Sequence, residues 1–241
     1  MSARFEIVTI FPGMFSPVFA EGVVSRAIKQ GIVSLGLHDL RDYAEGRHRK
    51  VDDEPFGGGA GMVFKPEPIY RAVEAIRAMD GASPSRCILL SPQGARFDQR
   101  AAERYARGEE RLILICGRYE GVDERVREQL ADEELSVGDF ILTGGELAAM
   151  ILVDAVSRLI PGTLGSAESA ERESFTEEMF DYPVYTRPAE FRGMKVPDVL
   201  LSGHHADIER WRRVQATQKT MKNRPELLVP EAAQGADPGK R

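Results

Sequence analysis

The sequence predicts an α/β fold, in which helices flank a mostly parallel sheet, followed by a small, mainly helical second domain. Through the first two-thirds of the 241 residues, short apolar runs of high strand propensity alternate with amphipathic segments of helical spacing. This alternation is typical of βα units with parallel strands, covered by helices on both faces. After Gly165 the chain changes to an acidic stretch and then to a basic helical one, and its length allows one or two domains at roughly 150 residues each.

The expected elements follow one another in a regular order. Strands are expected at 5–10, 32–37, 87–90 and 112–116, with an extended segment at 135–142. Helices are expected at 23–29, 66–79, 98–107, 124–130 and 146–159. The helix from Pro66 has the clearest pattern, because proline suits a first helical turn and apolar side chains recur three and four residues apart.

Composition narrows the class of protein. Hydrophobic residues make up 42% and charged residues 29%, a balance typical of a folded globular chain. No apolar run approaches the roughly 20 residues that cross a bilayer, and the N-terminus lacks the apolar core of a signal peptide. Cys87 and Cys116 each lie in an apolar run, which favours buried, reduced thiols. Without a signal peptide or a membrane span, and with reduced thiols, we expect a cytoplasmic protein. No Cys/His cluster has zinc spacing, so we expect no metal site.

The net charge of −6 argues at first against a nucleic-acid partner. The acids, however, cluster in residues 166–181, which contain six acids and one arginine. Basic residues gather at 47–50 and at 210–224. Because phosphate contacts depend on local charge, these patches keep an RNA partner possible, with binding that weakens steeply as salt rises.

Three junctions between strands and loops are candidates for a ligand site. They are Ser91–Gly94, Gly117–Gly121 and Thr143–Glu146. Each alone is ordinary turn chemistry, but in an α/β sheet ligands bind beyond the carboxyl ends of the strands, so three consecutive junctions predict one composite pocket. The run 57–62 is glycine-rich yet matches neither the P-loop nor the dinucleotide-binding pattern.

Several charged residues are open to more than one interpretation. Arg47, Arg49 and Lys50 either contact phosphates or neutralise the acids at 52–54. Arg158 closes an apolar helix and is either a reactive group or a partner of the helix dipole. Glu173 is one of six acids in its segment, and residue type alone does not single it out.

Taken together, the motifs resemble the bacterial tRNA (guanine-N1)-methyltransferases, the TrmD family of the SPOUT (trefoil-knot) methyltransferases. The segments that carry the resemblance span residues 7 to about 228 in the expected order. They are IVTIFPGMF (7–15), RKVDDEPFGGGAGMV (49–63), LLSPQG (89–94), ICGRYEGVDERV (115–126), SVGDFILTGGELAAM (136–150), DAVSRLIPG (154–162), YPVYTRP (182–188), VPDVLLSGHH (196–205) and IERWR (208–212).

The resemblance implies a trefoil knot in the C-terminal part of the first domain and S-adenosylmethionine as the methyl donor. It places the donor on the three junctions. The implied cofactor-binding residues are Ser91, Pro92, Gly117, Tyr119, Glu120, Val137, Gly138, Asp139, Phe140, Ile141, Leu142, Gly144 and Gly145. It also implies a homodimer with each active site built across the interface, for which the apolar helix 146–159 offers a contact face.

The implied substrate is the anticodon stem-loop of tRNA, and the target is N1 of guanine 37. Since N1 carries a proton, the reaction needs a general base, and an arginine near O6 stabilises the charge that develops there. The matching positions are Glu173 as the base and Arg158 as the arginine. The sequence departs from the family here, because Glu173 replaces an aspartate. Glu171, Glu177 and Asp181 are the alternative bases.

These observations divide the chain into an S-adenosylmethionine-binding domain (1–164), an acidic linker (165–176) and a small helical tRNA-binding domain (177–241). The main alternative is a SPOUT methyltransferase that acts on another RNA position, with the same fold and cofactor. A non-enzymatic RNA-binding module would leave the three glycine junctions unexplained. A small-molecule α/β enzyme would leave the basic helical domain without a purpose.

Overall fold

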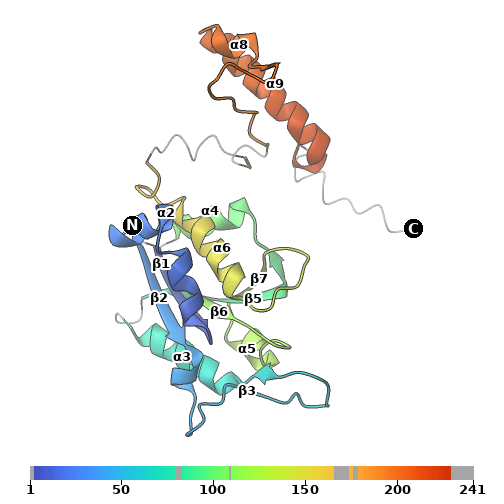
Figure 1. The fold of residues 1–241 in the computed structure, drawn as a ribbon. Helices are drawn as coiled ribbons and strands as arrows, with labels where there is room; N and C mark the ends of the chain where they lie inside the picture. Colours follow the sequence, from blue (N-terminus) through green and yellow to red (C-terminus); the bar gives the residue numbers. More distant parts are fainter. Residues whose placement is uncertain (1–2, 80–82, 109, 166–173, 176–178, 229–241) are drawn as a thin grey trace, which may run out of the picture. The chain divides into compact units, whose positions relative to one another are not determined.

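A computed structural model of the protein describes residues 3–79, 83–108, 110–165, 174–175 and 179–228 (Figure 1). The chain divides into two units, Met1–Ala167 and Glu168–Arg241. The predicted acidic linker lies mostly outside the described residues, so its boundaries and character stay a prediction. The same holds for the last residues, 229–241.

The first unit is built on a five-stranded parallel sheet, which confirms the predicted α/β class. The order of its strands is β2-β1-β6-β5-β7. Their bounds are β1 Ala3–Thr9, β2 Val33–Asp39, β5 Ser85–Arg96, β6 Arg111–Cys116 and β7 Glu133–Ser136. The trefoil knot stays a prediction.

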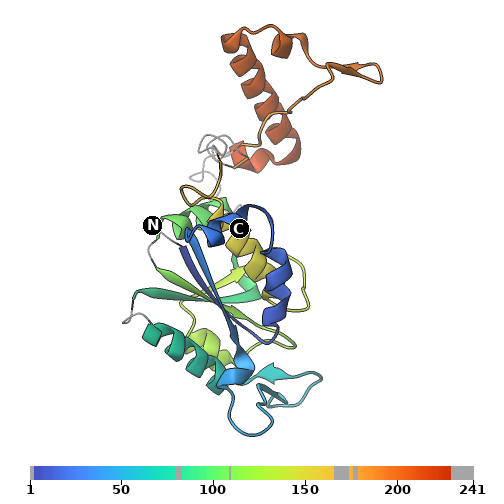
Figure 2. The ribbon, with the colours of Figure 1, turned by 60° about the vertical axis from the view of Figure 1, so that its left-hand side comes forward.

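Helices cover both faces of this sheet (Figures 1 and 2). One face carries α2 (Gly22–Lys29), α4 (Gln99–Arg107) and α6 (Glu146–Ser157), and the other carries α3 (Pro66–Ala78) and α5 (Glu124–Gln129). Successive β6 side chains alternate between the two cores. Leu112 and Leu114 belong to the first core, and Ile113 and Ile115 belong to the second. A central strand buried on both faces is apolar throughout, which explains the continuous run in the sequence.

Shorter elements connect these layers in the first unit. They are η1 Pro12–Met14, α1 Phe15–Val18, η2 Leu40–Tyr43, β3 Asp52–Asp53 and β4 Val63–Phe64.

Capping sets the start of one predicted helix, because the Asp98 carboxylate accepts a hydrogen bond from the Ala101 amide at 2.8 Å. Asp98 is therefore the cap, and α4 itself begins at Gln99.

The other predicted strands differ from the observed ones by one or two residues at their ends, but two strand ends beside the candidate pocket differ by about six residues. The extended segment expected at 135–142 ends as β7 at Ser136. There Gly138 has a φ of 149°, and its amide donates to the Ser136 hydroxyl at 3.2 Å, which turns the chain. The strand expected at 87–90 continues to Arg96, with an irregularity in its pairing between Leu90 and Ala95. The first predicted junction therefore lies inside β5 as a bulge.

The second unit contains a small hairpin and helices. Its elements are β8 Glu190–Phe191, β9 Met194–Lys195, α8 Asp198–Leu201, α9 His205–Asn223 and η4 Pro225–Leu228. The predicted basic helix is present as α9. The buried Thr220 hydroxyl donates to the Ala216 carbonyl and accepts from the Phe180 amide, both at 2.8 Å, and so ties the preceding loop to α9. Across the described ranges of both units, no helix combines the length and apolarity needed to span a bilayer.

Both cysteines are buried free thiols, as expected. Burial raises the pKa of Cys87 to about 12 and that of Cys116 well above its usual value. The thiolate is the reactive form of cysteine, so neither side chain offers a nucleophile near neutral pH. No cluster of three metal-ligating His, Cys, Asp or Glu side chains occurs among the described residues.

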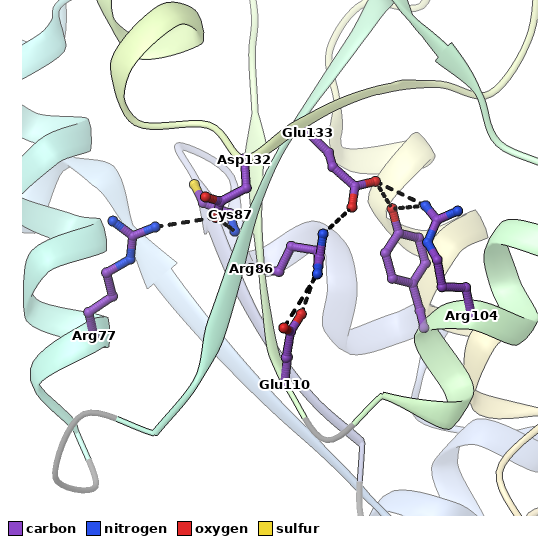
Figure 3. Close-up of polar contacts among 8 residues, drawn as sticks. Arg77, Arg86, Cys87, Arg104, Glu110, Asp132 and Glu133 are labelled. Carbon is purple, nitrogen blue, oxygen red and sulfur yellow. Dashed lines mark hydrogen bonds and ion pairs between the residues drawn. The ribbon is translucent and has the colours of Figure 1, made fainter.

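A polar network joins the amino-terminal ends of β5, β6 and β7 (Figure 3). Arg86 pairs with Glu110 at 2.7 Å and with Glu133 at 2.6 Å. Glu133 also accepts hydrogen bonds from Tyr105 at 2.5 Å and Arg104 at 3.0 Å. Burial raises the pKa of Glu133, but the bonds from Tyr105 and Arg86 outweigh it and leave the pKa below its usual value. The network therefore stabilises the ionised carboxylate.

Glu133→Gln is expected to lower the free energy of unfolding by about 1–3 kcal/mol at pH 7, because Arg86, Arg104 and the buried Tyr105 hydroxyl lose a charged acceptor. A depressed native pKa stabilises the fold above the unfolded-state pKa, about 4.3 for glutamate. That contribution disappears as pH falls through the native pKa. The gap between variant and parent in urea unfolding should therefore narrow below about pH 4.

The control for this prediction is Glu103→Gln, which breaks an exposed pair with Arg107 on α4. We expect it to change the unfolding free energy by less than about 0.5 kcal/mol at any pH. Equal losses in the two variants, or a loss for Glu133→Gln that stays constant down to pH 3, would contradict the role given to the network.

Candidate active site

A cavity of about 390 Å³ lies at the carboxyl ends of β5, β6 and β7. All three predicted junctions contribute to it, through residues 91–93, 117–121 and 143–145. Ligands bind at this edge of open α/β sheets because the loops, rather than the buried strands, can adapt to them. The structure thus brings together segments that are separated by up to about 50 residues in the chain.

Most of the residues implied as cofactor-binding line this cavity. They are Ser91, Pro92, Gly117, Tyr119, Glu120, Val137, Gly138, Phe140, Ile141, Leu142, Gly144 and Gly145. Asp139 is the one that does not line it, and its exposed carboxylate pairs with Arg96 at 2.9 Å. The structure gathers these residues, and their binding role stays a prediction.

The wall of the cavity combines apolar side chains with a closely spaced backbone. Tyr119, Phe140 and Ile141 are exposed apolar side chains among the lining residues. The Gly145 amide donates to the Gly117 carbonyl at 2.9 Å, which holds two of the junctions together. Flat apolar faces and backbone polar groups suit the binding of an aromatic ring whose edge carries donors and acceptors.

Two positions require glycine because a neighbouring backbone segment lies against them. A Cβ at Gly145 would lie 2.8 Å from the Cα of Cys116, and one at Gly94 would lie 2.4 Å from the backbone of Glu134. Real Cβ atoms do not approach backbone atoms so closely. These positions therefore allow neighbouring segments to meet without a side chain between them.

Behind the cavity lies a buried ionic cluster that sequence reasoning did not select. The Glu146 side chain is 1% exposed and accepts hydrogen bonds from Arg118 Nε, at 3.1 Å to each carboxylate oxygen. It also accepts from the Thr9 hydroxyl at 2.8 Å. The Arg118 guanidinium lies over the Phe11 ring, 4.3 Å from its centroid. A glutamate in the first turn of an apolar helix, after two glycines, was the available signal.

This cluster connects three elements that bound the site. Thr9 ends β1, Arg118 follows β6, and Glu146 opens α6. The backbone of Arg118 also forms an isolated antiparallel β-bridge with Gly144, next to the start of α6. The ion pair thus fixes the 117–121 loop against the turn that begins α6.

The predicted catalytic residues lie in different parts of the chain. Arg158 is the half-buried residue that caps α6, and its amide donates to the Asp154 carbonyl at 3.2 Å. Glu173 and the alternative bases Glu171 and Glu177 lie outside the described residues. Asp181 is described, and its carboxylate accepts from the Tyr182 amide at 2.8 Å.

The basic residues of the 47–63 loop partly neutralise nearby acids. Arg49 pairs with Asp42 at 2.9 Å, and Lys50 pairs with Asp53 at 2.8 Å. Hydrogen bonding from Lys50 lowers the pKa of Asp53. Both pairs are exposed, so the side chains remain able to exchange these partners for phosphates. The two interpretations of these residues thus stay open.

Comparisons with known proteins agree with one another over more than nine-tenths of the chain. The family model described as "tRNA (Guanine-1)-methyltransferase TrmD" matches residues 3–230. A protein named "tRNA (guanine-N(1)-)-methyltransferase" from Geobacter sulfurreducens is 55% identical over 93% of this chain and 91% of its own length. Relatives of the same name from Citrifermentans bemidjiense and Dehalococcoides mccartyi are 53% and 52% identical, over 93% of this chain and 89% and 90% of their own lengths.

Proposed function

The chain belongs to the tRNA (guanine-1)-methyltransferase TrmD family, and from this premise we propose that it methylates N1 of guanine 37 in tRNA with S-adenosylmethionine as the donor. Methylation of guanine N1 in tRNA is the activity that membership supports. The donor, the position in the tRNA and the catalytic base are the proposed parts. The observation that carries the proposal is the single cavity into which the three junctions converge.

The residues of the cavity fit this donor. Its volume of about 390 Å³ lies within the usual range of ligand pockets, about 300–1,000 Å³. The apolar faces of Tyr119, Phe140 and Ile141 suit an adenine ring, and the glycine-rich turns leave backbone groups accessible to its edge. The bound donor would supply a methyl group on a positively charged sulfonium sulfur. The residues that would hold it are those of the three junctions.

We assign the proton transfer to Glu173 and charge stabilisation to Arg158. The N1 proton would pass to the Glu173 carboxylate as N1 takes the methyl group that the bound donor supplies, so that one N–C bond would form as one S–C bond breaks. The Arg158 guanidinium donates to O6, where negative charge develops. The base must leave its stack to reach these groups. Glutamate in place of aspartate keeps a similar solution pKa, about 4.3 against 3.9, on a stem longer by one methylene.

The second unit supports RNA binding through α9. Its basic side chains are Arg210, Arg212, Arg213, Lys219 and Lys222, against Asp207 and Glu209. We propose that this helix contacts phosphates of the anticodon stem-loop, which would steer and orient the tRNA without reading its sequence. The proposal places the enzyme in the cytoplasm with its substrate. The trefoil knot of the family belongs to the same proposal.

An exposed apolar stripe on α6 supports the proposed homodimer. Leu147 and Ile151, four residues apart on this otherwise buried helix, are 45% and 46% exposed. Phe11 and Val18, before and within α1, are also exposed apolar side chains. Apolar side chains that recur on one helix face and remain exposed mark an interaction surface. In the proposed dimer this stripe lies in the interface that completes each active site.

Methyl transfer from labelled S-adenosylmethionine tests the function directly. Two unmodified tRNA transcripts that differ only in guanine or adenine at position 37 are incubated with the protein. We expect label in the guanine transcript alone, because adenine has an amino donor where guanine has O6, and Arg158 would then meet a donor in place of an acceptor. Label in both transcripts, or in neither, would contradict the proposed substrate.

Glu173→Gln is expected to lower the rate of single-turnover methylation by about 10²–10⁴-fold, because it removes the general base. Donor affinity, measured by calorimetry, should stay unchanged, since the first unit holds the cavity. Glu171→Gln, two residues earlier, serves as the matched control and should keep the parent rate. If Glu173→Gln kept the full methylation rate, Glu173 would not be the general base and another acid would have to be.

Ile151→Asp is expected to shift the protein from dimer to monomer in sedimentation velocity, because a charge cannot be buried unpaired in an apolar contact. Methylation should fall with dimer content. Ala75→Asp places the same charge at an exposed position of α3 and should leave the dimer intact. A dimer that survives Ile151→Asp would move the interface elsewhere.

A further inference from the structure

We propose that the tip of the β8–β9 hairpin binds an unpaired base of the tRNA, which stacks on the Phe191 ring beside the Arg192 guanidinium. This inference rests on tRNA as the substrate of the proposed function. It goes beyond the phosphate contacts proposed for α9, because it assigns a second surface of the chain to the flat face of a base.

The hairpin turns within two residues. Phe191 lies opposite Met194 in the antiparallel register, and Arg192 and Gly193 between them both have a positive φ, 52° and 78°. A turn of this kind matches the twist of the two strands that it joins. A positive φ is unfavourable for arginine, and glycine or asparagine is the usual residue there. The sequence therefore places a cation at the tip against the local backbone preference.

The apolar side chains of the hairpin are exposed. Phe191 is 55% exposed and Met194 is 65% exposed, and every residue from Val184 to Lys195 belongs to the exposed class. Within the second unit, the hairpin projects away from α9 (Figure 2). Packing in a core therefore does not account for the Phe191 ring. Two neighbouring exposed apolar side chains on a projecting hairpin indicate a contact surface.

The charge of the hairpin favours RNA as the partner. The Arg192 guanidinium lies over the Phe191 ring, 5.2 Å from its centroid. Residues 183–197 contain three basic residues and one acid, in a chain whose net charge is −6. That acid, Glu190, pairs with Lys195 at 3.8 Å, and no carboxylate of the described part of the chain pairs with Arg192. An aromatic ring beside a cation matches a nucleotide, whose base has a flat face and whose phosphate is negative.

Stacking and charge affect different measurements. A base that stacks on an aromatic ring adds affinity without releasing counterions, whereas each phosphate contact makes binding more sensitive to salt. The hairpin belongs to the second unit and the donor cavity to the first. A contact that is the same in the bound substrate and in the transition state affects the KM for tRNA and leaves kcat unchanged.

The test measures the affinity of the full-length protein for an unmodified tRNA transcript by fluorescence anisotropy. Phe191→Ala should raise the dissociation constant about 10- to 100-fold. Phe191→Leu should raise it nearly as much, because leucine keeps apolar area but has no flat ring. Phe191→Tyr keeps the ring and should stay within about twofold of the parent. In methylation assays, Phe191→Ala should raise the KM for tRNA by the same factor and leave kcat unchanged.

Two further variants separate charge and general apolarity from stacking. Arg192→Gln should weaken binding and lower the slope of log affinity against log salt by about 0.7, the value for one contact with a single strand. Phe191→Ala should leave that slope unchanged. Leu201→Ala removes another exposed apolar side chain, on α8, and should keep the parent affinity. If Phe191→Ala does not fold, the comparison of Phe191→Leu with Phe191→Tyr still decides the question.

The outcomes distinguish this inference from the proposed function. A parent protein that neither binds nor methylates the guanine transcript would overturn the proposed function. A parent that does both, with Phe191→Ala or Phe191→Leu at the parent affinity, would overturn the role of the hairpin alone. A Phe191→Ala variant that changes from dimer to monomer in sedimentation velocity would assign the hairpin to a contact between two copies of the chain, and would also overturn it.

Discussion

The buried carboxylate of Glu146 imposes the constraint on which the site depends. A carboxylate withdrawn from water is tolerated only when charged and polar donors satisfy it, and here Arg118 and Thr9 do so. Because the three residues come from α6, the loop after β6 and the end of β1, satisfying one charge fixes three segments at the carboxyl edge of the sheet. The Gly145–Gly117 hydrogen bond then closes the two junctions on one another. The cavity is a consequence of this arrangement.

The proposed mechanism assigns donor binding to the first unit and proton removal to the acidic segment. Backbone groups and apolar faces of the first unit would hold the donor, and they need no change of protonation to do so. Proton removal is assigned to Glu173, which follows Arg158 by 15 residues. Such a division makes methyl transfer depend on the tRNA being in place, since the donor site alone contains no proposed base. It also allows donor binding and catalysis to be perturbed separately.

The sequence predicted those features that repeat along the chain. The alternation of apolar runs with amphipathic segments predicted the parallel sheet and the helices on its two faces. The glycine-containing junctions predicted the location of the cavity. The Arg118–Glu146 pair was missed because its members are 28 residues apart and leave no local pattern. The end of β7 was misplaced because Gly138 turns a segment whose apolar residues continue to Leu142. Family resemblance, rather than periodicity, led to the predictions of the donor, the target atom and the knot.

The most direct measurement for the central claim is a crystal structure of the protein with S-adenosylmethionine. The account predicts electron density for the donor in the cavity, between the Ser91–Gln93 bulge, the 117–121 loop and the 137–145 turn, with Arg118 still paired to Glu146. Density for the donor at any other surface, or an Arg118 that leaves Glu146 to contact the ligand, would contradict it.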